Sequence, residues 1–273
     1  MNGRTIVSSM HVALIAGSLW WSASSASAQT LSQYTSEPPF LTEAVAPNIL
    51  LLMDNSGSMD NSAYHHANEA YNPAKAYYGY FDPTLCYSYG SNRFQIGTPR
   101  AATAPTCGAT YPWDGNFLNY MTMSRFEIAK WVMMGGKCTP RAVNGTCYPG
   151  GMLRLETDDR FTALTADATG VTSYTGTRCF DRSGNNLIVY GGAACGGGST
   201  SHTLVVDIAS EPNGVIQQIG DKARFGLMQF KGAGDGGQVL ADVGSGMTSM
   251  VNAIQNATAS TWTPLGESLY EAT

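Results

Sequence analysis

The residues best suited to binding chemistry in this sequence are one carboxylate and two hydroxyls, Asp54, Ser56 and Ser58, spaced two residues apart. Oxygen atoms are the ligands that hard divalent cations prefer, and Mg²⁺ binds them in octahedral geometry while keeping several waters. We therefore expect a metal site with Ser56 and Ser58 as direct ligands and Asp54 bound directly or through water. Gly57 lets the backbone turn between the two serines without a clashing Cβ atom.

The number of acids at this turn predicts what the ion is for. A divalent cation that faces one carboxylate and neutral hydroxyls keeps a net positive charge, so it can still bind a carboxylate of another molecule. A site built only to hold the ion would surround it with acids. We expect a non-enzymatic, ligand-bridging site that holds Mg²⁺, with Ca²⁺ or Mn²⁺ as alternatives. A metal-assisted enzyme is the weaker alternative, because the sequence offers no general base beside the turn.

A strand must place this turn at the edge of a sheet. Residues 48–53 form a continuous apolar run, which is typical of a strand buried on both faces, and the turn follows at its carboxyl end. Open α/β sheets bind ligands at that edge. Residues 224–230 and 238–243 indicate two further strands joined as a hairpin. The sequence therefore predicts the beginning of a doubly wound α/β sheet.

Helical patterns accompany these strands. Apolar residues recur at helical spacing over residues 117–134 and predict one helix, with a capping box from Ser124 and Glu127 and a stop at Gly135. This helix would supply a layer against the sheet.

Shorter helices are predicted at residues 215–219 and 247–257. A last helix begins near the end of the chain, where Pro264 suits the first turn and Thr263 suits the cap. Thr263 would thus lie at the start of a helix.

Two long stretches interrupt the α/β pattern. Residues 60–116 are rich in Tyr, Asn, Pro and Gly without sustained periodicity, and we interpret them as an irregular insertion. Residues 137–210 contain four cysteines and short β-like runs, which predict a disulfide-stapled, β-rich insertion.

The six cysteines predict disulfides rather than a metal site. None belongs to a C-x-x-C pair, few histidines are present to complete a zinc site, and the count is even. Of the fifteen possible connectivities, we favour pairing between sequence neighbours: Cys86 with Cys107, Cys138 with Cys147, and Cys179 with Cys195.

The first residues predict export. Arg4 precedes an apolar stretch over residues 12–21, and Ala26-Ser27-Ala28 is a cleavage pattern, so residues 1–28 are interpreted as a signal peptide and 29–45 as a linker. We expect no transmembrane segment after cleavage and a location in the periplasm, at the outer membrane or on the cell surface. A net charge of −5 without a Lys/Arg run argues against nucleic acid as a partner.

The stretch Asp54-Asn55-Ser56-Gly57-Ser58, followed much later by Thr263-Pro264-Leu265-Gly266-Glu267, resembles the metal-ion-dependent adhesion site of von Willebrand factor A domains. The resemblance implies a Rossmann-like, doubly wound α/β fold over residues 46–273, incomplete at the C-terminus and carrying the two insertions. It also implies that Ser56, Ser58 and Thr263 are direct ligands and that Asp54 is a direct or water-mediated one. A further aspartate of that family's site is expected beyond Thr273.

The insertions resemble the PilY-type proteins of bacterial type IV pili. The resemblance is carried by Tyr78-Gly79-Tyr80-Phe81-Asp82-Pro83 and by the segment from Trp113 to Tyr120. It implies a minor pilus component that acts in assembly, as a tip adhesin and in surface sensing. The expected partners are minor pilins at the pilus tip and a host or abiotic surface ligand with an exposed carboxylate. The alternative is a structural assembly component in which the metal only fixes loops.

Overall fold

A computed structural model describes residues 45–65, 69–103, 106–156 and 161–273. Ala46–Thr273 form a compact unit of their own. The predicted signal peptide and nearly all of the predicted linker lie outside the described residues. Among the helices of the described ranges, none combines the length and the apolar character needed to cross a bilayer.

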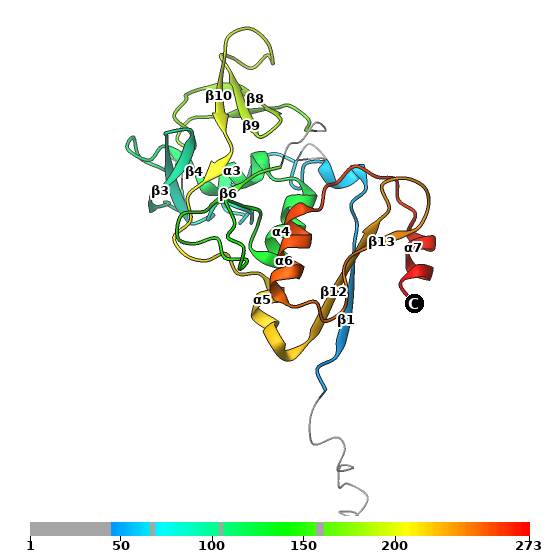
Figure 1. The fold of residues 1–273 in the computed structure, drawn as a ribbon. Coiled ribbons are helices and arrows are strands. Elements are labelled where there is room, and N and C mark those ends of the chain that lie inside the picture. The colour runs from blue at the N-terminus through cyan, green and yellow to red at the C-terminus, as the bar shows by residue number, and fades with distance from the viewer. Residues whose placement is uncertain (1–44, 66–68, 104–105, 157–160) are drawn as a thin grey trace, which may run out of the picture. The chain divides into compact units, whose positions relative to one another are not determined.

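Residues 54–58, which we call the metal turn, follow the first strand of a three-stranded sheet with the order β1-β12-β13 (Figure 1). β1 (Asn48–Met53) runs parallel to β12 (Arg224–Phe230), and their register pairs Asn48 with Arg224 and Met53 with Gln229. β12 then pairs antiparallel with β13 (Gly237–Ala241). The expected strands and hairpin are therefore confirmed. The doubly wound, Rossmann-like class stays a prediction, because the sheet has one parallel pair among the described residues.

The prediction that β1 is buried on both faces is wrong. Met53 is buried in a core that β12 and the helices share, and Ile49 and Leu51 of the same face are partly buried against it. Leu50 and Leu52 are also partly buried but do not belong to this core. The difference arises because α4 and α6 lie against one face of the sheet (Figure 1). We call this core, which holds Met53, Phe126, Met134, Phe225, Leu227, Met250 and Ile254 among others, the sheet core.

The helix predicted over residues 117–134 is two helices, α3 (Gly115–Thr122) and α4 (Arg125–Met134). Met123 between them is extended, with φ −78° and ψ 128°. The predicted capping box of Ser124 and Glu127 forms, and it starts a new helix instead of continuing the old one. Gly135 ends α4 in the left-handed conformation, as expected (φ 80°).

Four short helical elements complete this part of the fold. They are η2 (Gly57–Asp60), α5 (Val215–Ile219), η3 (Gly220–Lys222) and α6 (Met247–Asn256). Of these, α5 and α6 confirm the predicted helices, and α6 ends one residue early.

The stretch 60–116 is irregular only in part, which corrects the prediction of a wholly irregular insertion. It contributes β2 (Leu85–Gly90), β3 (Arg93–Pro99) and β4 (Trp113–Asp114) to a six-stranded sheet of order β4-β2-β3-β11-β6-β5. Aromatic side chains build its core, which we call the aromatic core and which includes Tyr77, Tyr80, Phe81, Tyr87, Phe94, Trp113 and Phe117. The periodicity is weak because tyrosine supplies much of the buried surface and is spread among polar residues.

The stretch 137–210 is β-rich and stapled, as predicted. Its strands are β5 (Cys138–Thr139), β6 (Met152–Arg154), β7 (Leu164–Asp167), β8 (Thr177–Ser183), β9 (Asn186–Tyr190), β10 (Ser199–Thr203) and β11 (Val205–Val206). Strands β10-β9-β8-β7 form a separate sheet. The three disulfides are those expected: Cys86–Cys107, Cys138–Cys147 and Cys179–Cys195.

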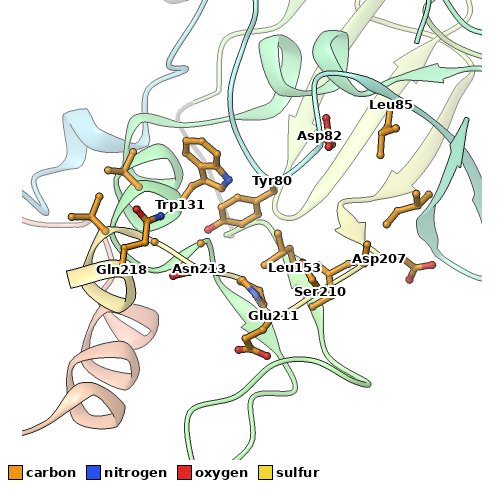
Figure 2. A pocket seen from close by; sticks show the side chains of 18 of the residues that line it. Tyr80, Asp82, Leu85, Trp131, Leu153, Asp207, Ser210, Glu211, Asn213 and Gln218 are labelled. Carbon is orange, nitrogen blue, oxygen red and sulfur yellow. The ribbon is translucent and has the colours of Figure 1, made fainter. Parts of the chain in front are cut away.

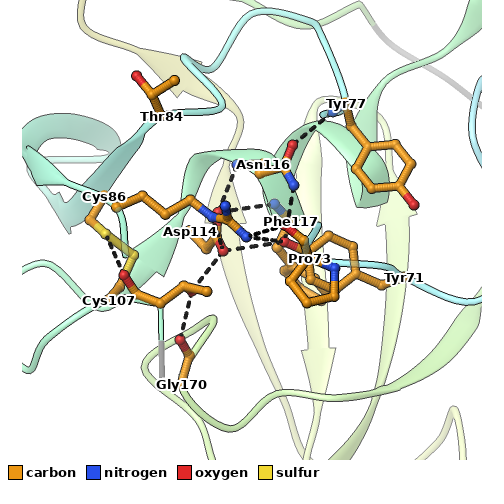
Figure 3. A network of polar contacts seen from close by, with 12 residues as sticks. Tyr71, Pro73, Tyr77, Thr84, Cys86, Cys107, Asp114, Asn116, Phe117 and Gly170 are labelled. Atoms are coloured by element: carbon orange, nitrogen blue, oxygen red, sulfur yellow. Dashed lines mark hydrogen bonds and ion pairs between the residues drawn. A yellow bond between two sulfur atoms is a disulfide. The ribbon is translucent and has the colours of Figure 1, made fainter. Parts of the chain in front are cut away.

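A buried carboxylate organises the start of α3 (Figure 3). Asp114 accepts hydrogen bonds from the backbone N–H of Asn116 at 2.8 Å and from the side chains of Arg100 and Thr106, each at 2.7 Å. Tyr71 donates to the same carboxylate at 3.2 Å, and burial raises the pKa of its phenol. The network caps the helix and joins it to the strands around it, so its role is structural.

Candidate metal site

The two serines of the candidate site lie together. Their Oγ atoms are 3.1 Å apart, and the backbone N–H of Ser56 donates to Asp54 Oδ1 at 2.8 Å. Neighbouring ligands in an octahedral shell with metal–oxygen distances of about 2.1 Å are separated by about 3.0 Å. The spacing of Ser56 and Ser58 therefore fits two adjacent positions around one Mg²⁺ ion.

Thr263 reaches the neighbourhood of this turn but does not bond to it. The loop ahead of it joins the turn at Thr261, whose carbonyl accepts from the N–H of Gly57 at 3.0 Å. Thr263 itself is exposed, and among the described residues its hydroxyl makes no hydrogen bond to Ser56 or Ser58. The structure thus brings together three of the four predicted residues and leaves Thr263 two positions beyond the contact.

Thr263 is also not the helix cap that the sequence predicts. α7 spans Leu265–Glu271, and Pro264 occupies the cap position without a side-chain hydrogen bond. Its ψ of 62° is not helical, so the helix begins one residue later than expected. The threonine side chain therefore has no role in starting α7.

Asn55 holds the turn in place, and sequence reasoning missed it. Its side chain is buried, accepts from Phe230 N–H at 2.9 Å and donates to the Phe230 carbonyl at 3.3 Å, so it closes the end of β12. Its backbone carbonyl accepts from the N–H groups of Ser260 and Thr261. An amide can make these contacts because it both donates and accepts. Asn55 thereby fixes the metal turn to β12 and to the loop that carries Thr263.

A buried lysine supports the same loop from the other side. Lys130 of α4 donates to the carbonyls of Gln255 and Ala257 at 3.0 and 2.7 Å and to Glu156 Oε1 at 2.6 Å. Its side chain is fully buried, and this burial lowers its pKa. The ammonium thus ties the end of α6, and the loop after it, to the stapled insertion.

The ion pairs extend beyond Lys130. Glu156 also binds Lys137 at 2.6 Å, and its backbone N–H donates to Glu127 at 2.7 Å. Glu127 in turn pairs with Arg182 of β8 at 2.9 Å, with both side chains buried. Charged groups from α4, the loop after β6 and β8 therefore form one connected network.

The donor set at the turn suits a hard cation with open coordination positions. It offers hydroxyl oxygens and one carboxylate, and no cluster of three or more His, Cys, Asp or Glu exists elsewhere in the described ranges. If a divalent ion binds, Ser56, Ser58 and Asp54 would hold it, and the remaining positions would be filled from outside the turn.

Comparisons with known proteins concern mainly the insertions. Residues 68–207 match the family described as PilY1 homolog, small alpha/beta domain, and this match covers just over half of the 273 residues. The chain is 31% identical over 98 residues to a type IV pilus biogenesis factor PilY1 homolog of Xylella fastidiosa strain Temecula1. That alignment covers 32% of this chain and 6% of the relative, so the chain spans a small part of its length. No solved structure matches the chain significantly. The chain belongs to the family of PilY1 homologs that share this small α/β domain.

Proposed function

We propose that this chain is part of an exported, type IV pilus-associated factor that binds a divalent cation and, through it, an acidic residue of a partner. Family membership supports the association with pili, as does the similarity to the Xylella relative, a type IV pilus biogenesis factor. The ion is Mg²⁺, with Ca²⁺ or Mn²⁺ as alternatives, and the partners are minor pilins at the pilus tip and a surface ligand with an exposed carboxylate. The role is adhesion and assembly rather than catalysis, and the location is the cell envelope or surface.

The observation that carries this proposal is the 3.1 Å separation of the Ser56 and Ser58 hydroxyl oxygens at the carboxyl end of β1. Two uncharged oxygens leave most of the charge of a divalent ion uncompensated, and Asp54 adds only one negative charge. The ion would supply an electrophilic centre for an incoming carboxylate. The von Willebrand factor A resemblance assigns Thr263, two residues beyond the Thr261 contact, as a further ligand.

A binding experiment tests the ion first. Titration calorimetry with MgCl₂, and with MnCl₂ as a probe visible by electron paramagnetic resonance, should detect one site. Ser58→Ala and Asp54→Asn should each weaken binding by at least about tenfold, because each removes a ligand or a charge from the shell. Ser201→Ala and Asp242→Asn alter exposed residues away from the turn and should leave binding unchanged. Equal binding by all four variants would refute the assignment of the site.

An adhesion experiment tests the role. Surface attachment of bacteria that carry Asp54→Ala should be lost, as should that of the wild type in chelator, while circular dichroism shows an unchanged fold. Chelator-resistant attachment by the Asp54→Ala strain would contradict a metal-bridged contact.

The second candidate function is structural, and the burial of Ser56 favours it. Ser56 is only 3% exposed, so an ion bound there could act mainly on the loops around it. In that case Ser56→Ala and Ser58→Ala lower stability and piliation together. Attachment measured per pilus separates the two functions: it falls if the ion bridges to a ligand and stays constant if the ion only fixes loops.

A further inference from the structure

A surface groove lies where the aromatic core meets α4 and the segment of residues 207–218 (Figure 2). Its volume is about 580 Å³. Asn55 and the metal turn do not line it, so it is independent of the proposed metal site. Residues far apart in sequence meet in it: Tyr80 lies near its middle, Gln218 at one side, and Leu85 and Asp207 at the other (Figure 2).

The groove is preformed, because the backbone at the end of α4 packs directly against the backbone of residues 213–214. A Cβ atom at Gly214 would lie 2.3 Å from the backbone of Met133, and one at Gly135 would lie 2.5 Å from the N atom of Asn213. Glu211 fixes the same segment by accepting from the backbone N–H groups of the stapled loop, at Cys147 and Tyr148. A preformed site loses little conformational entropy on binding.

Most of the lining is apolar. Tyr80 is buried, with its phenol oxygen accepting from the N–H of Lys137 at 2.9 Å, and Trp131 stands beside it (Figure 2). Trp131 stacks on Tyr78 with ring centroids 5.9 Å apart, which keeps the indole in one orientation. Aliphatic side chains form the walls, and two of them, Val132 and Val215, are 44% and 45% exposed. Aliphatic walls favour aliphatic side chains over a hydrated sugar.

The charged residues of the lining are all acids, Asp82, Asp207 and Glu211, and no Lys, Arg or His lines the groove. Asp207 pairs with Arg93 at 2.8 Å. Asp82 is exposed and accepts from the backbone N–H and the hydroxyl of Thr84. Glu211 accepts from backbone N–H groups and also interacts electrostatically with Arg141. Within the described ranges, Asp82 is therefore the one acid of the lining that pairs with no cation.

We propose that this groove binds an extended segment of a partner protein that carries Lys or Arg next to aliphatic side chains. The aliphatic groups would pack between Trp131 and the walls, and the cation would lie by Asp82. Charge complementarity on the rim selects a basic segment over an acidic one. The chemistry is opposite to that of the proposed metal site, which attracts a carboxylate, so either proposal can fail alone.

Peptide binding to the full chain tests the groove. The probe is a fluorescein-labelled hexapeptide of alternating leucine and lysine, followed by fluorescence anisotropy in metal-free buffer. We expect saturable binding that weakens when serine replaces either leucine or lysine, and no binding when glutamate replaces lysine. If the peptide with serine in place of leucine binds as tightly as the leucine–lysine peptide, the binding is general charge attraction and the proposal is wrong. Absence of saturable binding of the leucine–lysine peptide would also overturn it.

Matched variants locate the binding. Val132→Ser should weaken it by at least about tenfold, as for an apolar contact at the centre of an interface. Asp82→Asn keeps the acceptor for Thr84 and should weaken binding by about two- to fivefold, as for an exposed ion pair. The controls Val143→Ser and Asp235→Asn change exposed residues outside the groove. If the controls weaken binding as much as the groove variants, the peptide binds elsewhere and the proposal is wrong.

Discussion

Replacing Lys130 by methionine should destabilise the protein and release the loop that follows α6. Methionine keeps most of the aliphatic stem, so the packing of α4 changes little, but the ammonium is lost. The carbonyls of Gln255 and Ala257 then lose their charged donor, and Glu156 loses one of its two lysine partners.

The expected cost is about 3 kcal/mol. Removing one partner of a buried ion pair costs about 3–5 kcal/mol, because the group left behind is buried without compensation. The value should lie at the lower end, since Glu156 keeps Lys137 at 2.6 Å and is 13% exposed. Lys75→Met is the matched control: Lys75 pairs with Glu69 at 3.6 Å with both side chains more than half exposed, and its loss should cost less than about 0.5 kcal/mol.

Urea unfolding measures the loss in the free energy of unfolding, and amide hydrogen exchange shows which segments are destabilised. In Lys130→Met the amides of Ser260 and Thr261, which donate to the Asn55 carbonyl, should exchange faster, while those of β8 and β9 should not. The pKa of Lys130 is lower in the folded chain than the usual 10.5. Between these two values the folded chain has released the Lys130 proton while the unfolded chain still binds it, so the wild type should gain stability as the pH rises through this window. Lys130→Met should lack this gain. A cost below about 1 kcal/mol with unchanged exchange would refute the role of Lys130.

Variants of two other buried polar residues, Asn55 beside the metal turn and His202 of β10, give further tests. Asn55→Ala removes a buried amide that pairs with both backbone groups of Phe230, so urea unfolding should show a loss of about 2–3 kcal/mol, whereas Asn256→Ala, at an exposed position, should be nearly neutral. His202 is buried, and this burial lowers its pKa from 6.5 to about 4. Its contribution to stability is therefore complete above pH 6.5 and is lost as the pH falls toward 4, because the unfolded chain takes up the proton first. In His202→Gln, the midpoint of urea unfolding should depend less on pH between 6.5 and 4. An unchanged pH dependence would contradict the assignment of this stability loss to His202.

The sequence predicts local features of the fold well. The capping box at Ser124 and the disulfides between neighbouring cysteines involve residues close in sequence, so the sequence spacing favours both, and the structure confirms them. The break between α3 and α4 shows the limit. The apolar spacing continues across Met123, but Met123 packs in the aromatic core and Phe126 in the sheet core. A helical period cannot reveal that its two halves serve different cores, although the cap itself marks a helix start.

The residues of the candidate site also differ in how far the sequence predicts their positions. Ser56 and Ser58 are two residues apart on a tight turn, so their proximity follows from the sequence. Thr263 comes near only through the pairing of residues about 200 positions apart, and the side-chain contact that the resemblance implies is not formed. Asn55 could not be singled out, because asparagine is an ordinary turn residue and its partner Phe230 is identified only by the fold.

Asn55 and Lys130, which hold the loop after α6, share one property that bears on recognition. Asn55 binds the backbone of Ser260 and Thr261, and Lys130 binds the carbonyls of Gln255 and Ala257, so neither depends on the loop's side chains. The side chains that follow, including an 89% exposed Trp262, are therefore presented on a backbone that is already fixed. Lys130 extends this support to Glu156, and through it to Glu127 and Arg182 of β8. Gln255 of α6 also accepts from the N–H of Cys138 and from Arg141. The stapled insertion is therefore joined to the loop beside the proposed metal turn through both Lys130 and Gln255.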